Sequence, residues 1–261
     1  MDENYQTYLN RAMRLTLPET YRSQVQHLQE SPKFQRHAEK GWQPAPFPGY
    51  TIVTPPGNEE TENAALYESL KQYQQQLAQQ LGADLFVPVP PESFHLTLAD
   101  LIWDSAYRDT SQHKPEFEVQ LQEQIATIFR QSQTVAEGKP LHFQALGLMV
   151  MPRAIAICLA PADEHSYDRA LKLRRAVFQN SDLIGLGIEQ QYYFTPHITL
   201  GYFGTIPAPE TLTTLGDRFV QLNQQWLEQE SNVFEVKRAE LRKFDDMTHY
   251  YREPDWAVFT F

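Results

Sequence analysis

Two short stretches of the sequence decide the fold, because they repeat one pattern: residues 94–98 read FHLTL and residues 196–200 read PHITL. Side chains along a strand alternate between its two faces. The histidine and threonine of each stretch therefore share one face, and the apolar residues, which can pack under helices, share the other. The next residues on the His–Thr faces are the small Ala99 and Gly201, which would leave room for a ligand beside each pair.

The two stretches occupy equivalent places in a repeated order of elements. Hydrophobic periodicity predicts a strand, a helix, a second strand and another helix in residues 50–135, and the same order after an added hairpin in residues 141–230. The predicted strands cover residues 50–53, 94–103, 141–150, 153–160, 197–203, 233–244 and 256–261, and the predicted helices cover residues 60–81, 116–132, 164–179 and 208–229. We therefore predict an α+β fold: a single bilobal domain over residues 49–261, in which duplicated sheet-and-helix halves with pseudo-two-fold symmetry face a central cleft.

The first 48 residues differ from the rest of the chain. Residues 4–15 and 18–35 are polar and rich in glutamine, with apolar residues spaced as in two short surface helices. Three prolines within residues 43–49 then fix backbone angles and remove amide donors, which ends any regular element there. We predict that residues 1–48 form an N-terminal helical extension and a linker.

The composition limits the ligands that the chain can hold. Its 261 residues carry a formal net charge of −11, and a grip on a nucleic-acid backbone needs clustered lysine and arginine. Long nucleic acid is therefore disfavoured as a partner, whereas a small anion in a local pocket is not. No apolar run approaches about 18 residues and the first residues do not form a secretory leader, so we predict a cytoplasmic protein without a membrane partner.

Several other chemistries lack the residues that they need. The single cysteine, Cys158, lies in an apolar run, which predicts a buried and inert thiol without an internal disulfide. The glycines lack the spacing of a phosphate-binding loop, and the histidines lack the spacing of a helical metal site. We predict neither a metal nor another cofactor.

Two His–Thr pairs that face one point suit acid–base chemistry on a phosphodiester. One neutral histidine can activate water or a ribose hydroxyl while the other, protonated, donates to the leaving oxygen. Histidine is the side chain whose ordinary pKa allows both forms near neutrality. The threonine hydroxyls can donate to the non-bridging oxygens, where negative charge must be held. This reasoning does not decide which histidine is the acid and which is the base.

At this point the sequence resembles a known family. The two His-x-Thr-x motifs are similar to the signature of the 2H phosphoesterase superfamily, which includes RNA 2′-5′ ligase-like proteins and 2′,3′-cyclic nucleotide phosphodiesterases. The resemblance covers about residues 50–261, and the N-terminal extension resembles a poorly characterised branch. It implies a bilobal fold in which His95 and His197 are the acid/base pair and Thr97 and Thr199 bind the phosphate oxygens.

We therefore predict a metal-independent phosphodiesterase that acts on a small cyclic phosphate or a short ribose-linked phosphodiester. A non-catalytic nucleotide sensor that uses the same residues is the alternative, and a scaffold protein with an unused cleft is another. Arg153, Tyr251 and Arg252 are weaker candidates for substrate binding, since tyrosine can stack on a base and arginine can pair with a phosphate. The substrate, the role of the extension and the oligomeric state stay open.

Overall fold

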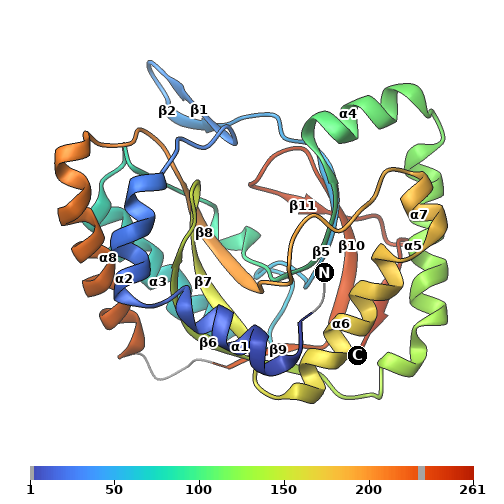
Figure 1. The fold of residues 1–261 in the computed structure, drawn as a ribbon. Coiled ribbons are helices and arrows are strands. Elements are labelled where there is room, and N and C mark those ends of the chain that lie inside the picture. The colour runs from blue at the N-terminus through green and yellow to red at the C-terminus, as the bar shows by residue number, and fades with distance from the viewer. Residues whose placement is uncertain (1–2, 229–232) are drawn as a thin grey trace.

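The computed structural model describes residues 3–228 and 233–261, in which two five-stranded antiparallel sheets dominate (Figure 1). The first sheet has the order β11-β10-β3-β5, with β12 beside β10. Its strands are β3 (Gly49–Val53), β5 (Thr97–Trp103), β10 (Arg238–Phe244), β11 (Tyr250–Tyr251) and β12 (Val258–Thr260). The second sheet has the order β4-β8-β7-β6-β9. Its strands are β4 (Phe86–Pro88), β6 (Leu141–Val150), β7 (Ala154–Pro161), β8 (His197–Phe203) and β9 (Val233–Val236).

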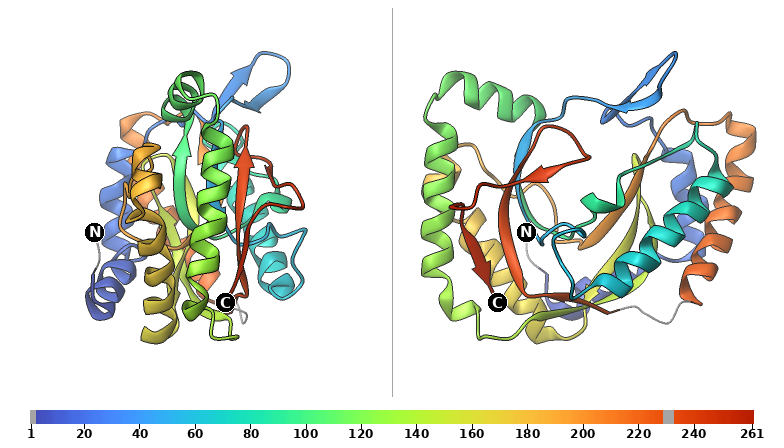
Figure 2. Two further views of the ribbon diagram at one scale, coloured as in Figure 1. Left: turned by 90° about the vertical axis from the view of Figure 1, so that its right-hand side faces the viewer. Right: turned by 180° about the vertical axis from the view of Figure 1, so that it is seen from behind.

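The helices divide between the two sheets and give the molecule two lobes, as Figures 1 and 2 show from opposite sides. Beside the first sheet lie α4 (Asp104–His113), α5 (Phe117–Gln131), α6 (Glu164–Phe178) and α7 (Ser181–Gly185). Beside the second sheet lie α1 (Tyr5–Arg14), α2 (Pro18–Gln24), α3 (Ala64–Leu81) and α8 (Leu212–Leu227). The predicted α+β, bilobal fold is confirmed.

The lobes are not the two contiguous halves that the sequence suggested. Helix α3 follows β3 of the first sheet but packs against β4 and β8 of the second. Helix α6 follows β7 of the second sheet but packs against β5 and α5 as well. The predicted strand 233–244 is also divided, because β9 pairs with β6 whereas β10 pairs with β3. The chain thus crosses between the lobes several times, and this holds the two sheets together.

Several boundaries differ from the prediction. Strand β8 has the predicted bounds, and β6, α5 and α6 agree to within a residue or two. The predicted helix 208–229 begins with a 3-10 turn and continues as α8, and its last predicted residue lies outside the described residues. The sequence did not predict α4, nor β4, β11 and α7, which have only three, two and five residues.

The N-terminal segment contributes to the core instead of lying on the surface. The buried Tyr8 and Tyr21 donate hydrogen bonds from their hydroxyls to the carbonyls of Leu159 in β7 and Leu148 in β6. The predicted helix 18–35 ends early, in α2 and a 3-10 turn, and the chain continues as a hairpin of β1 (Phe34–His37) and β2 (Gly41–Pro44). The proposed division at residues 48 and 49 stays a prediction.

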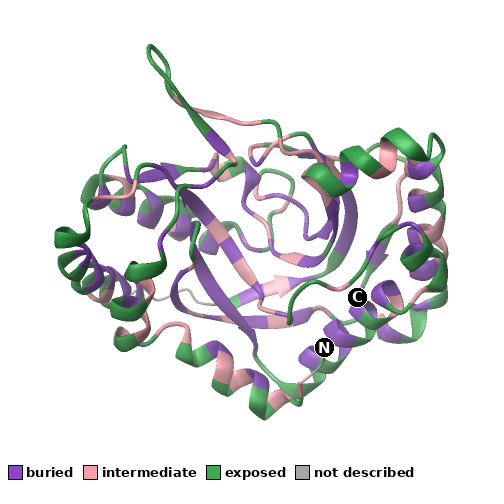
Figure 3. Cartoon of the chain, turned by 45° about the horizontal axis from the view of Figure 1, so that its top comes forward, coloured by how far each residue is buried: buried purple, intermediate pink, exposed green. Residues whose placement is uncertain are grey.

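The buried side chains line the inside of both lobes, where the strands are largely purple in Figure 3. Cys158 is fully buried in β7, as predicted, and burial raises the pKa of its thiol to about 12, so the thiol stays protonated and inert. Within residues 3–228 and 233–261, none of the helices has the length and apolar character that a membrane span requires.

Candidate active site

The two His–Thr motifs meet where the two sheets join. Leu96 and Ile198, the apolar centres of the motifs, form an isolated antiparallel bridge between the strands. An antiparallel bridge at this position sets His95 opposite Thr199 and Thr97 opposite His197. All four side chains then share one face, and the two histidines are diagonal neighbours, which are roughly 7–8 Å apart along the backbone with their Cβ atoms somewhat closer. The geometry suits two imidazoles on either side of one phosphate.

Burial along the motifs separates the two faces as the sequence predicted. Leu96 and Ile198 are fully buried, whereas His95, Thr97, His197 and Thr199 all stay partly exposed. Neither threonine hydroxyl has a hydrogen-bond partner among the described residues. The four side chains are therefore open to a ligand.

The prediction that Ala99 and Gly201 follow on the same face is wrong, because each strand contains a β-bulge just after its motif. In β5, Thr97 pairs with Val53 and Asp100 pairs with Thr51, two residues earlier on β3. In β8, the partners of Thr199 and Tyr202 are likewise two residues apart on β7. Side chains two residues apart on a strand share a face, so each bulge places the third residue after the threonine beside the motif.

Glycine stands at position 201 because of the packing of the core and not to leave room for a ligand. A Cβ built at Gly201 would lie 2.5 Å from the Phe86 ring of the neighbouring strand β4, so only glycine fits without movement of that ring. The space at Gly201 is therefore filled by the core, and the residues that border the motifs are Asp100 and Tyr202.

Both imidazoles are held in the same way by the backbone two residues earlier. His95 Nδ1 lies 2.7 Å from the Ser93 carbonyl oxygen, and His197 Nδ1 lies 2.7 Å from the Thr195 carbonyl oxygen. A carbonyl oxygen only accepts, so Nδ1 of each ring must carry the hydrogen. In the neutral rings Nε2 is therefore the unprotonated nitrogen, the form that a general base needs.

The supports behind these two carbonyls differ. Ser93 ends a short 3-10 turn (Pro91–Ser93), and its hydroxyl donates to the Pro90 carbonyl at 2.7 Å. Thr195 is instead held from α1, because Arg11 donates from Nη1 to the Thr195 hydroxyl and from Nη2 to the Phe194 carbonyl, each at 2.8 Å. The N-terminal segment therefore fixes the loop that orients His197.

The electrostatic surroundings of the two rings also differ. Burial lowers the pKa of His95 to about 4, and the charges of His197, Arg242 and Lys33 act in the same direction. Burial lowers the pKa of His197 as well, but the carboxylate of Asp100 opposes that decrease. Of the two rings, His197 is therefore the one with a carboxylate that opposes the loss of its proton, and His95 is the one that stays neutral.

The first sheet packs a tyrosine and an arginine beside His95. The ring of Tyr250 lies 4.2 Å from the His95 ring, centroid to centroid. Arg242 is almost fully buried and donates from Nη1 to the Tyr250 carbonyl at 2.8 Å. Its guanidinium also forms ion pairs with Glu59 and Glu240, at 2.5 Å each. This network fixes the strand that holds Tyr250 against His95.

The three weaker candidates contact other parts of the chain. Arg153 is exposed in the turn between β6 and β7, where its carbonyl pairs with Phe203, six residues along β8 from His197, or about 20 Å. Tyr251 follows Tyr250 on β11, so its side chain points to the opposite face, where its hydroxyl donates to Asp245. Arg252 donates to the Trp256 carbonyl within a turn. The structure does not bring these three side chains together with the motifs.

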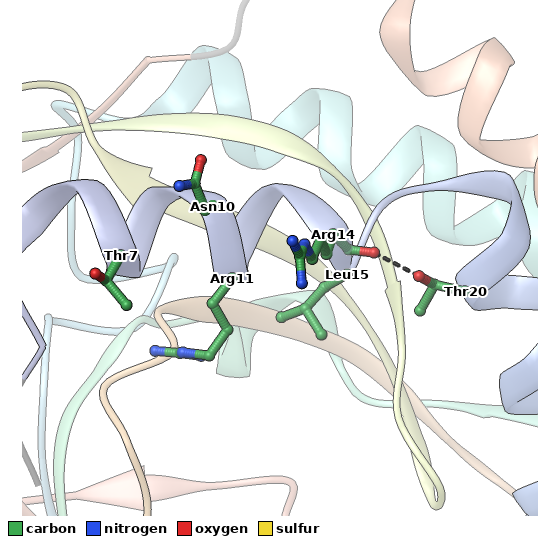
Figure 4. Close-up of a pocket in the computed structure, with 6 residues that line it drawn as sticks. All are labelled: Thr7, Asn10, Arg11, Arg14, Leu15 and Thr20. Carbon is green, nitrogen blue, oxygen red and sulfur yellow. Dashed lines mark hydrogen bonds between the residues drawn. The ribbon is translucent and has the colours of Figure 1, made fainter.

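The hollow drawn in Figure 4 is a separate feature of the N-terminal segment. It measures about 440 Å³ and lies where α1 turns into α2, lined by Thr7, Asn10, Arg11, Arg14, Leu15 and Thr20. The motif residues do not line it. In the part of the chain that the structure describes, no group of three or more histidine, cysteine or acidic side chains could hold a metal ion.

The fold and the paired motifs define a class: a two-lobed α+β protein with two histidines and two threonines at the junction of its sheets. Residues 33–136, which include the first motif, match the family model described as 2H-phosphodiest: Domain of unknown function (DUF1868). Over residues 33–136, which are less than half of the chain, this match confirms the resemblance to the 2H phosphoesterase superfamily. No curated protein matches the chain by sequence.

Solved structures resemble the chain at low sequence identity. A conserved protein of unknown function from Agrobacterium tumefaciens strain C58 is 16% identical, with a TM-score of 0.58 over 87% of this chain and 91% of that chain, which indicates a shared fold. Escherichia coli LigT complexed with 3′-AMP is 13% identical, with a TM-score of 0.40 over 82% of this chain and 98% of that chain. A protein from Thermus thermophilus is 16% identical, with a TM-score of 0.43 over 81% and 96% of the two chains.

Sequence reasoning missed four residues near the site: Arg11, Lys33, Asp100 and Tyr250. Arg11 and Lys33 belong to the segment that was predicted to lie outside the bilobal domain, and contacts between distant parts of a chain leave no local pattern. Asp100 has a counterpart in Tyr202, since each stands three residues after its threonine. That shared spacing is a signal, but it points to the site only once the two bulges are known.

Proposed function

We propose that the protein is a metal-independent phosphodiesterase that hydrolyses a small cyclic phosphate of a nucleotide. The observation that carries the proposal is the bridge between Leu96 and Ile198, because it sets each histidine opposite the other motif's threonine. The match to the 2H-phosphodiest family model supports the same class of reaction. The cytoplasmic location inferred from the sequence remains a prediction.

The difference between the two rings assigns their roles in this proposal. His95, neutral at Nε2, takes a proton from water, and the water oxygen forms a bond to phosphorus. The bond between phosphorus and one ribose oxygen breaks, and the proton on Nε2 of His197 goes to that oxygen. The hydroxyls of Thr97 and Thr199 donate to the non-bridging oxygens as charge builds on them. Products are a phosphomonoester and a free ribose hydroxyl.

The test is to incubate EDTA-treated protein with the four common 2′,3′-cyclic nucleotides and to separate the products by chromatography. We expect conversion to nucleoside monophosphates at a rate that EDTA does not change. Binding of a cyclic nucleotide, measured by calorimetry, without any product would favour the nucleotide sensor. If the protein neither binds nor hydrolyses any nucleotide of this panel, the proposal is contradicted.

A further inference from the structure

Lys33 brings a positive charge from the N-terminal segment to the edge of the site. Its Nζ lies 3.4 Å from the Tyr202 hydroxyl. The same ammonium lies 4.9 Å from the centre of the Tyr202 ring and 4.8 Å from that of Phe47, so two aromatic faces hold it in place. The Ala45 amide donates to the Lys33 carbonyl at 3.0 Å and fixes the backbone at the base of the β1–β2 hairpin.

This ammonium has no carboxylate within ion-pair distance among residues 3–228 and 233–261. A partly buried cation that is held between rings but not neutralised is an attractive site for an anion. Its charge also reaches the motifs, because it lowers the pKa of both His95 and His197. In a chain with a net charge of −11, this is a local positive centre.

The position of Tyr202 sets the distance between this centre and the motif. Because of the bulge in β8, Tyr202 and Thr199 share a face, and their partners are two residues apart on β7. Two residues along β7 span about 7 Å, so the backbones of Tyr202 and Thr199 are separated by about this distance. An anion on Lys33 and Tyr202 would therefore not be the phosphate held between the histidines but a neighbouring group. A ribose separates its 5′-phosphate from a 2′,3′-cyclic phosphate by a comparable span.

We propose that Lys33 and Tyr202 form a second anion site, so that the preferred substrate is a nucleotide with a 5′-phosphate in addition to the cyclic phosphate that reacts. This inference rests on the proposed function and narrows its substrate class. Lys33 donates from Nζ to the 5′-phosphate oxygens, and the Tyr202 hydroxyl donates beside it. The N-terminal segment thus serves substrate selection.

The experiment compares two probes: adenosine 2′,3′-cyclic phosphate and the same compound with a 5′-phosphate. A hydrogen bond to a charged group contributes more binding free energy than one between neutral groups. We therefore expect the kcat/KM of the wild-type protein to be higher for the second probe by about tenfold or more. Lys33→Met should remove most of this preference, and Tyr202→Phe, which keeps the ring but not the hydroxyl, should reduce it less. Lys40→Met, which removes an exposed lysine from the same hairpin, should leave the preference unchanged.

Equal kcat/KM for the two probes in the wild-type protein would overturn the inference. An equal loss for both probes in Lys33→Met would overturn it too, because Lys33 would then contact the reacting phosphate. If the protein hydrolyses neither probe, the proposed function fails, but the anion site is still tested by calorimetry. Tighter binding of the 5′-phosphorylated probe that depends on Lys33 would then support the site alone.

Discussion

The two His–Thr motifs have the same local construction but different surroundings. In both, a carbonyl two residues earlier holds Nδ1 at 2.7 Å, an apolar residue anchors the strand, and a bulge brings a further residue to the site. Around His95 the neighbours are Tyr250 and the buried Arg242, both of the first sheet. Around His197 they are the Asp100 carboxylate and a loop that Arg11 holds from α1.

Two motifs of the same local construction thus acquire different electrostatic properties from the residues that pack behind them. Burial lowers the pKa of both rings, but the charge of Arg242 lowers that of His95 further, whereas the Asp100 carboxylate opposes the decrease at His197. Two groups with separated pKa values can act as base and acid at one pH.

The largest effect is expected from removing either ring. His95→Ala and His197→Ala should each lower kcat for a 2′,3′-cyclic nucleotide by about 10²–10⁴-fold, because each removes one proton-transfer group. His27→Ala, at an exposed position outside the site, should stay within about twofold. Circular dichroism would show that the folded state persists. Nearly full activity in either folded site variant would contradict the two-histidine mechanism.

A smaller effect is expected from Arg11→Met, which tests the support found only behind His197. Without its contacts to Thr195 and Phe194 the loop can shift, and we expect kcat to fall by about tenfold. The hydrogen bond from His197 to Thr195 raises the pKa of that ring, so the alkaline limb of the pH–rate profile should also move to lower pH. Arg11→Lys, which keeps the charge but not the two-pronged contact, should recover only part of the loss.

Arg14→Met is the matched control, since Arg14 lies on the same helix but is exposed. If Arg11→Met lowers the thermal stability but changes neither kcat nor the pH profile, then Arg11 only stabilises the fold.

The smallest effect is expected from Asp100→Asn. His197 must be protonated to act as the acid, so kcat/KM falls as pH rises through its pKa, which lies below the ordinary value of 6.5. Removing the Asp100 charge lowers that pKa further and should move the alkaline limb to lower pH by up to about one unit. The acidic limb, set by His95 at about 4, should stay in place. A shift of the acidic limb alone would contradict this assignment, because it would show that His197 is the base and His95 the acid.

The sequence predicted the features that the two motifs share and missed the residues by which their surroundings differ. The alternation of His95, Leu96 and Thr97 is a local pattern, and it was enough to predict the strands, the shared face and the two-lobed fold. Bulges depend on how neighbouring strands pair, so Asp100 could not be placed beside the motif from its own strand. The contact of Arg11 with Thr195 joins residues far apart in the chain, and no local pattern in either segment predicts it.

The most direct test of the two-histidine site is the pKa of each ring, measured by NMR titration of the imidazole signals in the folded, ligand-free protein. We expect His95 to titrate near pH 4 and His197 to titrate below its ordinary value of 6.5. We also expect His197→Gln to raise the pKa of His95, because a neighbouring positive charge is removed. Two independent titrations near 6.5 would contradict both the shared site and the division of roles.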